Sequence, residues 1–218
     1  MNLIHHKSQL RRSTMNLIHH LLCQSTGWRK VLETLVPWAL EGLTLGRDVL
    51  EIGPGFGVTT DLIRPAVENL TCVEIDPKLA QSLRGRMTGK SVTVLCENAT
   101  SMSIESASFD AVVCFTMLHH VPSPYLQDRL LSEVARVLRP GGIFLGTDSL
   151  YSWRFRILHL FDTMVVVNPQ TLPDRLGSAG FADVDVVVGM SAFRFRARKP
   201  AMKLKPDEVG KYSGGLLL

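Results

Sequence analysis

The sequence predicts an α/β protein with a Rossmann-like, doubly wound sheet of seven strands. After Gly46, short apolar runs alternate with helical patterns, which indicates parallel strands with helices on both faces. A glycine-rich turn, "GPGFG" at residues 53–57, follows the first apolar run. Only "GMS", residues 189–191, separates the last two runs, so they predict an antiparallel hairpin after five parallel strands.

Each expected strand is a run of four to six residues. The runs lie at 49–52, 70–75, 92–95, 111–115, 143–146, 184–188 and 192–197. Helical spacing is clearest between residues 126 and 138, and "RPGG" at 139–142 is expected to end that helix. Residues 151–167 predict a helix followed by a loop, and 171–179 predict a further helix.

The N-terminal part of the chain contains a repeat, since "MNLIHH" occurs at residues 1–6 and again at 15–20. We interpret residues 1–14 as a duplicated extension that is expected to be disordered, with a transit peptide as the alternative. Residues 15–45 predict a helical lid in which Pro37 ends or kinks the second helix. Residues 46–198 form the predicted main domain, and 199–218 a loose tail.

The composition is that of one ordinary globular domain: 218 residues, 45% hydrophobic, formal charge +4. The basic residues form no dense run, so nucleic acid is not indicated, and no apolar stretch approaches the roughly 20 residues of a membrane span. Cysteines lie at 23, 72, 96 and 114 without zinc-type spacing, so we expect reduced thiols, a cytoplasmic protein and no metal ligands. Peripheral membrane contact and oligomeric state stay open.

The glycine turn indicates a ligand without phosphate. A dinucleotide site requires a glycine where this chain has Val58, and the lysine of a phosphate loop is absent. Glu51 precedes the turn, and its carboxylate suits a ligand with an ammonium or sulfonium group. Gly53 and Gly55 allow the backbone to approach that ligand closely.

The end of the second predicted strand indicates a nucleoside. Glu74 can accept two hydrogen bonds from ribose hydroxyls, and Ile75 can lie against an adenine ring. An adenosine at one end and a charged amino acid at the other together select S-adenosylmethionine.

Five motifs in order also resemble those of class I S-adenosylmethionine-dependent methyltransferases: "VLEIGPGFG", "VEIDP", "ENA", "SFDAVVCFTMLHHV" and "RVLRPGG". The resemblance is to the small-molecule branch, which includes ubiquinone, menaquinone and sterol methyltransferases, and it covers residues 48–148. It implies a seven-stranded sheet with the last strand antiparallel. It also implies that the cofactor contacts Glu51, Gly53, Pro54, Gly55, Gly57, Glu74, Ile75, Asn98, Ala99 and Phe115.

One position departs from the family pattern, because Asn98 stands where an aspartate is usual. Its amide oxygen can still accept a hydrogen bond from the adenine amine, but the negative charge is missing. Phe115, which follows the fourth predicted strand, is expected to close over the sulfonium end.

His119 and His120 are the candidates for catalysis, because they follow the fourth strand, where an acceptor would arrive. Either one could take a proton from the acceptor, or both could only order the loop. Asp148 is a further candidate for acid–base work. His19 and His20 lie on the expected lid helix and are weaker candidates for lining the pocket.

The expected function is methyl transfer to a small acceptor. A non-catalytic cofactor-binding subunit or sensor, and a nucleic-acid or protein methyltransferase, are the alternatives. Apolar and aromatic residues in 15–40 and 148–172 favour an apolar or aromatic acceptor. Arg194, Arg196 and Arg198 alternate with apolar residues, which favours a solvated strand face over a docking strip for anionic partners.

Overall fold

The computed structural model describes residues 16–160 and 162–201 of the chain. The expectations for residues 1–14 and for nearly all of the 199–218 tail therefore fall outside the described residues. Within them, no helix is long and apolar enough to cross a membrane.

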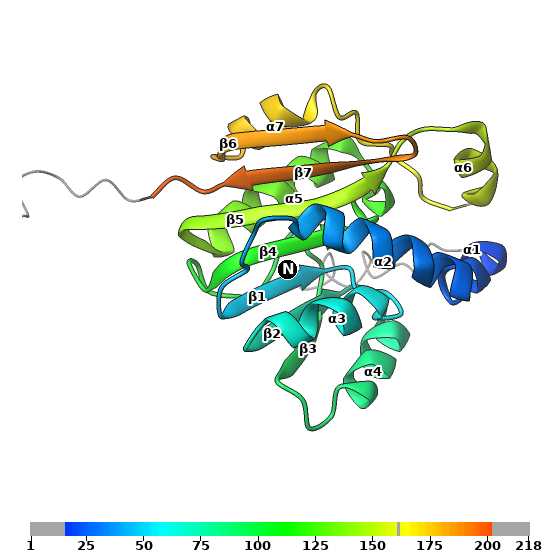
Figure 1. Ribbon diagram of the computed structural model, residues 1–218, viewed down its shortest axis with the longest axis horizontal. Helices are drawn as coiled ribbons and strands as arrows, with labels where there is room; N and C mark the ends of the chain where they lie inside the picture. The colour runs from blue at the N-terminus through cyan, green and yellow to red at the C-terminus, as the bar shows by residue number, and fades with distance from the viewer. Residues whose placement is uncertain (1–15, 161, 202–218) are drawn as a thin grey trace, which may run out of the picture.

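The seven-stranded sheet predicted from the sequence is confirmed, with the strand order β3-β2-β1-β4-β5-β7-β6 (Figure 1). The first five strands are parallel, and β7 runs antiparallel to both of its neighbours. The strands are β1 (Asp48–Ile52), β2 (Asn69–Glu74), β3 (Val92–Cys96), β4 (Phe109–Phe115), β5 (Leu138–Ser149), β6 (Ala182–Val188) and β7 (Ala192–Arg198).

The start of β5 differs from the prediction, because "RPGG" lies within the bounds of the strand instead of before it. The pairing with β4 passes from Phe109 opposite Leu138 to Ala111 opposite Ile143, so most of these residues bulge out of register. A Cβ on Gly142 would stand 2.9 Å from the carbonyl oxygen of Asp110. Glycine at this position therefore allows the backbones of β4 and β5 to approach closely at the bulge.

Helices cover both faces of the sheet, and polar N-caps open most of them. The α-helices are α1 (Leu17–Cys23), α2 (Thr26–Leu40), α3 (Val58–Ile63), α4 (Pro77–Arg86), α5 (Pro124–Val137), α6 (Trp153–Leu158) and α7 (Leu172–Ser178); two 3₁₀ turns are η1 (Arg64–Ala66) and η2 (Leu118–His120). Asn16, Ser25, Asp76, Ser123 and Ser152 each accept a backbone hydrogen bond at a helix start.

Side-chain alternation along the strands separates two apolar cores. Leu50, Ile52 and Val112 face α5 and α7, whereas Val49 and Val113 face α2, α3 and α4. Both cores are closed at the strands' carboxyl ends by loops, and Figure 1 shows α1 and α6 beyond that edge.

The arginines of β7 are not the solvated face that the sequence favoured. Arg196 donates to the carbonyl oxygens of Ala39 (2.9 Å) and Glu41 (2.8 Å), and Arg194 donates to that of Trp38 (3.0 Å). These carbonyls end α2, which continues through Pro37 to Leu40 and lacks further helical donors there. The two arginines thus fasten α2 to the sheet, and Arg198 alone of the three is exposed.

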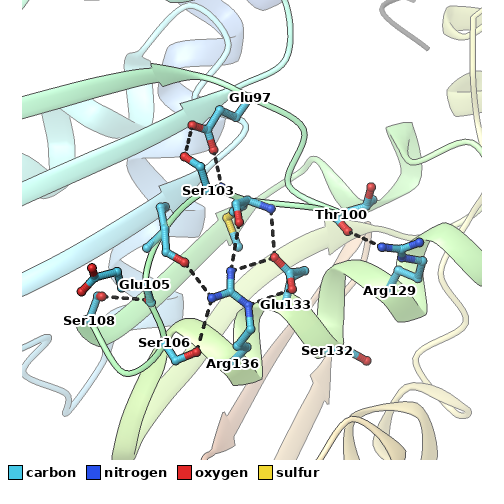
Figure 2. Close-up of polar contacts among 12 residues, drawn as sticks. Glu97, Thr100, Ser103, Glu105, Ser106, Ser108, Arg129, Ser132, Glu133 and Arg136 are labelled. Carbon is cyan, nitrogen blue, oxygen red and sulfur yellow. Dashed lines mark hydrogen bonds and ion pairs between the residues drawn. The ribbon is translucent and has the colours of Figure 1, made fainter. Parts of the chain in front are cut away.

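A network of polar contacts holds the loop that follows β3 against α5 (Figure 2). Arg136 pairs with Glu133 and donates to the carbonyl oxygens of Met102 and Ile104, at 3.1 and 2.6 Å. Arg129 reaches the carbonyl of Thr100 at 3.4 Å. This loop contains Asn98 and Ala99, so α5 fixes one wall of the site described next.

Candidate functional site

A cavity of about 720 Å³ lies at the carboxyl ends of β1, β2, β3 and β4. Parallel α/β sheets bind ligands at this edge, where the strand order reverses. Residues from the strand-end loops, α1, α2 and α6 line it, including Gly53, Pro54, Gly55, Glu74, Ile75, Asn98, Ala99, Phe115, His119 and His120.

The glycine turn has a left-handed backbone, which suits glycine. Gly53 and Gly55 have φ values of 65° and 54°, and a Cβ on Gly53 would stand 2.3 Å from Cγ of Met117. The Gly53 amide donates to the carbonyl of Val73 at 2.9 Å. This leaves a turn of bare backbone as the cavity wall, which a ligand can approach closely.

The third glycine of the motif, Gly57, has a packing role. It does not line the cavity, and it precedes α3 with a φ of 75°. A Cβ there would stand 2.5 Å from Cδ1 of Leu83 on α4. We therefore expect Gly57 to permit close packing of α3 and α4 instead of contacting the cofactor.

Glu74 joins the end of β2 to the glycine turn. One carboxylate oxygen accepts from the amide of Gly55 at 3.0 Å, and the other accepts from the amide of Asp76 at 2.9 Å. Burial raises the pKa of Glu74, and these amide hydrogen bonds oppose that rise. Each oxygen keeps a lone pair for a hydroxyl, so the side chain is oriented and still able to accept from a ribose.

Glu51 lies elsewhere than the sequence led us to expect. Its side chain is buried and does not line the cavity; it accepts hydrogen bonds from the hydroxyls of Thr59 and Thr60. Alternation along β1 turns it toward α3, away from the face of Leu50 and Ile52. Burial raises its pKa, and the threonine hydrogen bonds oppose this rise. Glu51 thus holds the turn against α3, and its contact with the cofactor stays a prediction.

Asn98 and Ala99 line the wall next to Glu74, but the amide of Asn98 is engaged differently from our expectation. Its oxygen already accepts from the backbone amide and the hydroxyl of Thr100, both at 2.9 Å. Only the NH₂ group of the Asn98 side chain therefore remains available to a ligand, and it can donate to a ring nitrogen of a purine. Ile75 keeps 49% of its surface exposed within this wall, and Phe115 is buried at the end of β4.

The structure separates the two histidines that the sequence left equivalent. His119 Nδ1 and Asp148 Oδ1 are 2.5 Å apart, and the backbone amide of His119 donates to Oδ2 of the same carboxylate at 3.0 Å. Asp148 is completely buried on β5 and also accepts from the amide of Ser149. His120 has no carboxylate partner among the described residues, and burial lowers its pKa well below the usual value.

Two residues of this part of the cavity escaped the sequence reasoning. His159, just after α6, packs against His119 with ring centroids 5.1 Å apart, and Asp162 pairs with His19 at 2.8 Å. The sequence places both in an apolar segment without a recognised motif, so no local signal connected them to the site. His19 does line the cavity, as the lid interpretation allowed, whereas His20 does not.

Comparison with known proteins shows similarity to methyltransferases. Residues 50–146 match the model of a methyltransferase domain. A protein of Mycolicibacterium smegmatis named as a probable S-adenosylmethionine-dependent methyltransferase is 36% identical over 146 residues, covering 65% of this chain and 54% of that protein. A ubiquinone biosynthesis O-methyltransferase of Xanthomonas oryzae pv. oryzae is 31% identical over 130 residues, covering 56% and 53%. The chain thus spans about half the length of these relatives.

Solved structures share the fold. The N-methyltransferase NodS from Bradyrhizobium japonicum, in complex with S-adenosyl-L-homocysteine, superposes with a TM-score of 0.64 at 18% identity, covering 88% of this chain and 96% of that one. A phosphoethanolamine N-methyltransferase of Haemonchus contortus, also with S-adenosylhomocysteine, gives 0.66 at 16% identity, covering 87% and 61%.

The order of the motifs, the strand topology and the bare glycine turn all agree with these comparisons, and so does the cofactor that the sequence selected. Residues 50–146 therefore match a methyltransferase domain, and the motifs and strand topology agree with the class I, S-adenosylmethionine-dependent type.

Proposed function

We propose that this protein transfers the methyl group of S-adenosylmethionine to a small apolar or aromatic acceptor that carries an acidic hydroxyl or a nitrogen–hydrogen group. The observation that carries the proposal is the buried pair of His119 and Asp148, in which His119 lines the same cavity as the glycine turn. The cofactor supplies a methyl group that its sulfonium already activates. The protein must then position the two reactants and accept a proton.

The residues present fit this cofactor. The left-handed turn at Gly53 and Gly55 gives the amino-acid portion a backbone wall, and Glu74 stands ready for the ribose hydroxyls. Ile75 and Ala99 give the adenine apolar surface, with the NH₂ group of Asn98 beside them. Because the backbone of residues 97–108 is tied to α5, this wall is built before a ligand arrives.

His119 is suited to accept the proton of the acceptor at Nε2. Its Nδ1 faces the carboxylate of Asp148, which fixes the tautomer that carries the proton on Nδ1. Nε2 makes no hydrogen bond to any described residue, and the ring lines the cavity. Asp148 acts as a positioning residue, because it orients the ring and stabilises the imidazolium formed when Nε2 takes the proton.

The walls beyond the histidines favour an apolar acceptor. Leu22, Trp28 and Leu32 line the cavity from α1 and α2, and Phe155 and Leu158 line it from α6. An aromatic or otherwise apolar molecule can bury its surface there while its acidic group reaches His119. The names of the relatives include both O- and N-methyltransferases, so oxygen and nitrogen acceptors both belong in a test.

The test uses S-adenosylmethionine with a labelled methyl group and a panel of phenols, aliphatic alcohols, aromatic amines, a peptide mixture and oligonucleotides. We expect label to pass to at least one phenol or aromatic amine, and turnover to fall in Asp148→Asn while KM for the cofactor stays unchanged. Label on oligonucleotide or peptide alone would overturn the small-acceptor proposal. Tight binding of S-adenosylhomocysteine with no transfer to extracts or panel would support a non-catalytic binding subunit instead.

A further inference from the structure

Three histidines from distant parts of the chain meet beside the cofactor pocket. His19 lies on α1, His120 ends η2 and His159 follows α6, and one ring nitrogen of each lies within 4.8 Å of those of the other two. All three line the same cavity, and His19 and His159 are buried. We propose that His19, His120 and His159 bind a divalent transition-metal ion, zinc being the best match. The sequence, without any metal motif, did not predict such a site.

The hydrogen bonds of the three rings leave one nitrogen of each ring free for an ion. Nδ1 of His19 pairs with Asp162 at 2.8 Å, and Nδ1 of His159 with the carbonyl oxygen of Phe155 at 2.8 Å. For His120, Nδ1 is buried and has no hydrogen-bond partner among the described residues. A carboxylate or carbonyl on the opposite nitrogen is the usual outer support of a metal-binding histidine.

The unengaged nitrogens are otherwise difficult to explain. Nδ1 of His120 and Nε2 of His159 are both buried without a hydrogen-bond partner among the described residues. A neutral imidazole that donates from one nitrogen presents a lone pair at the other, and a buried lone pair without a partner is costly. A metal ion satisfies these lone pairs together.

The protonation of the rings is compatible with metal binding. Burial lowers the pKa of His19, lowers that of His120 well below its usual value, and lowers that of His159 to about 4. The three rings are therefore neutral at pH 7, the form that ligates metals. Cys23, which also lines the cavity, keeps its proton, because burial raises its pKa to about 11.

The donor set selects the class of ion. Three imidazoles suit zinc, cobalt, nickel or copper, whereas magnesium and calcium require oxygen ligands. Tetrahedral ligands about 2.1 Å from zinc lie about 3.4 Å apart, so the rings need to close by roughly an ångström on binding. Three protein ligands leave a fourth position, which is typical of sites that bind a substrate group.

Hydrogen bonds around the proposed metal site also join the start of α1 to the end of α6 and the residues after it. The backbone amide of Asn16 donates to Asp162, and its side chain donates to the carbonyls of Leu158 and Leu160, both at 2.9 Å. An ion would thus fasten α1 to the segment after α6 at the mouth of the cavity. Binding of the acceptor at its fourth position would rest on the proposed function, whereas metal binding itself does not.

The experiment uses the full chain purified without a polyhistidine tag, stripped with a chelator and titrated with Co²⁺ as an optical probe, then with Zn²⁺ and Mg²⁺. We expect one Co²⁺ per chain with the visible bands of a tetrahedral site, displacement by Zn²⁺ and no effect of Mg²⁺. Replacement by glutamine in His159→Gln should abolish the bands, and Asp162→Asn should weaken affinity by roughly 10–100-fold. The matched control is His20→Gln on the same helix, whose ring bonds Gln24 and does not line the cavity.

The outcomes separate this proposal from the proposed function. A stripped wild type that binds neither Co²⁺ nor Zn²⁺, or binds them equally in His159→Gln, overturns the metal site. Calorimetric titration with S-adenosylhomocysteine shows whether each variant is folded and binds cofactor. Cofactor binding and methyl transfer without metal binding would contradict only the metal site. Metal binding without methyl transfer would contradict only the proposed function.

Discussion

We call the part of the cavity around Gly53, Glu74 and Asn98 the proposed cofactor half, and the part around its histidines the proposed acceptor half. The two halves are assembled in different ways. The cofactor half consists of strand-end turns whose contacts run mostly over short sequence distances: Glu74 bonds Asp76 two residues on and Gly55 nineteen residues back. Backbone groups supply much of its surface. The cofactor half therefore depends on local backbone conformation. Local conformation can be predicted from the sequence, here from the glycines and from the acidic residues at strand ends.

The acceptor half depends on side chains from distant segments. The pair of His19 and Asp162 spans 143 residues, and that of His119 and Asp148 spans 29. Its histidines come from α1, η2 and the segment after α6, so each lies in a different local context. The difference shows that the two proposed sites of one domain can be encoded differently. The cofactor site can be predicted from sequence motifs, whereas the acceptor site forms only when distant segments pack together.

The largest expected effect tests whether proton transfer depends on the acceptor half and not on the cofactor half. In His119→Gln, we expect turnover to fall by roughly 10²–10⁴, because glutamine cannot take the proton at Nε2. Affinity for S-adenosylhomocysteine should stay within about twofold, since His119 does not support the glycine turn or Glu74. Steady-state rates and calorimetric titrations measure the two quantities separately.

The neighbouring substitution His120→Gln provides the contrast. It should weaken Co²⁺ binding, as expected for a proposed ligand, whereas His119→Gln should leave Co²⁺ binding in place. Equal turnover in wild type and His119→Gln would remove the base from the mechanism. A parallel loss of cofactor affinity in His119→Gln would show that the two halves are coupled.

A second, smaller effect distinguishes two glycines of one motif within the cofactor half. Gly53→Ala should weaken cofactor affinity by roughly 10-fold, because the left-handed backbone is strained by about 1–2 kcal/mol and the new methyl group meets Met117 beside the cavity. Gly57→Ala should instead lower the free energy of unfolding by about 1–3 kcal/mol through its contact with Leu83.

Thermal unfolding and calorimetry on both variants check this separation. Gly89→Ala is the matched control, because it has the same left-handed strain, no atom within 4 Å of the new Cβ and no part in the cavity lining. If Gly57→Ala loses as much affinity as Gly53→Ala while remaining folded, the third glycine contacts the cofactor after all.

The outcome of the sequence predictions follows the same division. The five parallel strands, the hairpin and the cofactor were all readable, because short apolar runs and a glycine turn are local signals. For Glu51, the sequence shows a carboxylate near the turn but not which face of β1 it occupies. Arg194 and Arg196 were taken as solvated because their acceptors, the last carbonyls of α2, lie more than 150 residues away. His159 and Asp162 carried no local signal at all.

The smallest expected effect concerns the tie between α5 and the wall that carries Asn98. Glu133 accepts from Arg136 and from the amide of Met102, all at 2.9 Å, and the hydrogen bond from Arg136 lowers the pKa of Glu133. A carboxyl whose pKa is lower in the folded than in the unfolded state stabilises the fold fully above its unfolded pKa, about 4.3. That stabilisation disappears as the pH falls through the lower, folded value.

Glu133→Gln should therefore lower the free energy of unfolding by about 1 kcal/mol at pH 7, and the difference from wild type should shrink as the pH falls below the unfolded pKa of about 4.3. Cofactor affinity at pH 7 should change by less than about twofold, because Arg136 keeps its bonds to the carbonyls of Met102 and Ile104. The control is Glu105→Gln on the same loop, whose carboxylate makes no hydrogen bond or ion pair to the described residues. Denaturant titrations from pH 7 to pH 3 measure the difference. A constant gap between wild type and Glu133→Gln across that range would mean that the carboxylate's charge does not hold the loop. The wall of the cofactor half would then owe its position to Arg136, to Arg129 and to the packing of Met102.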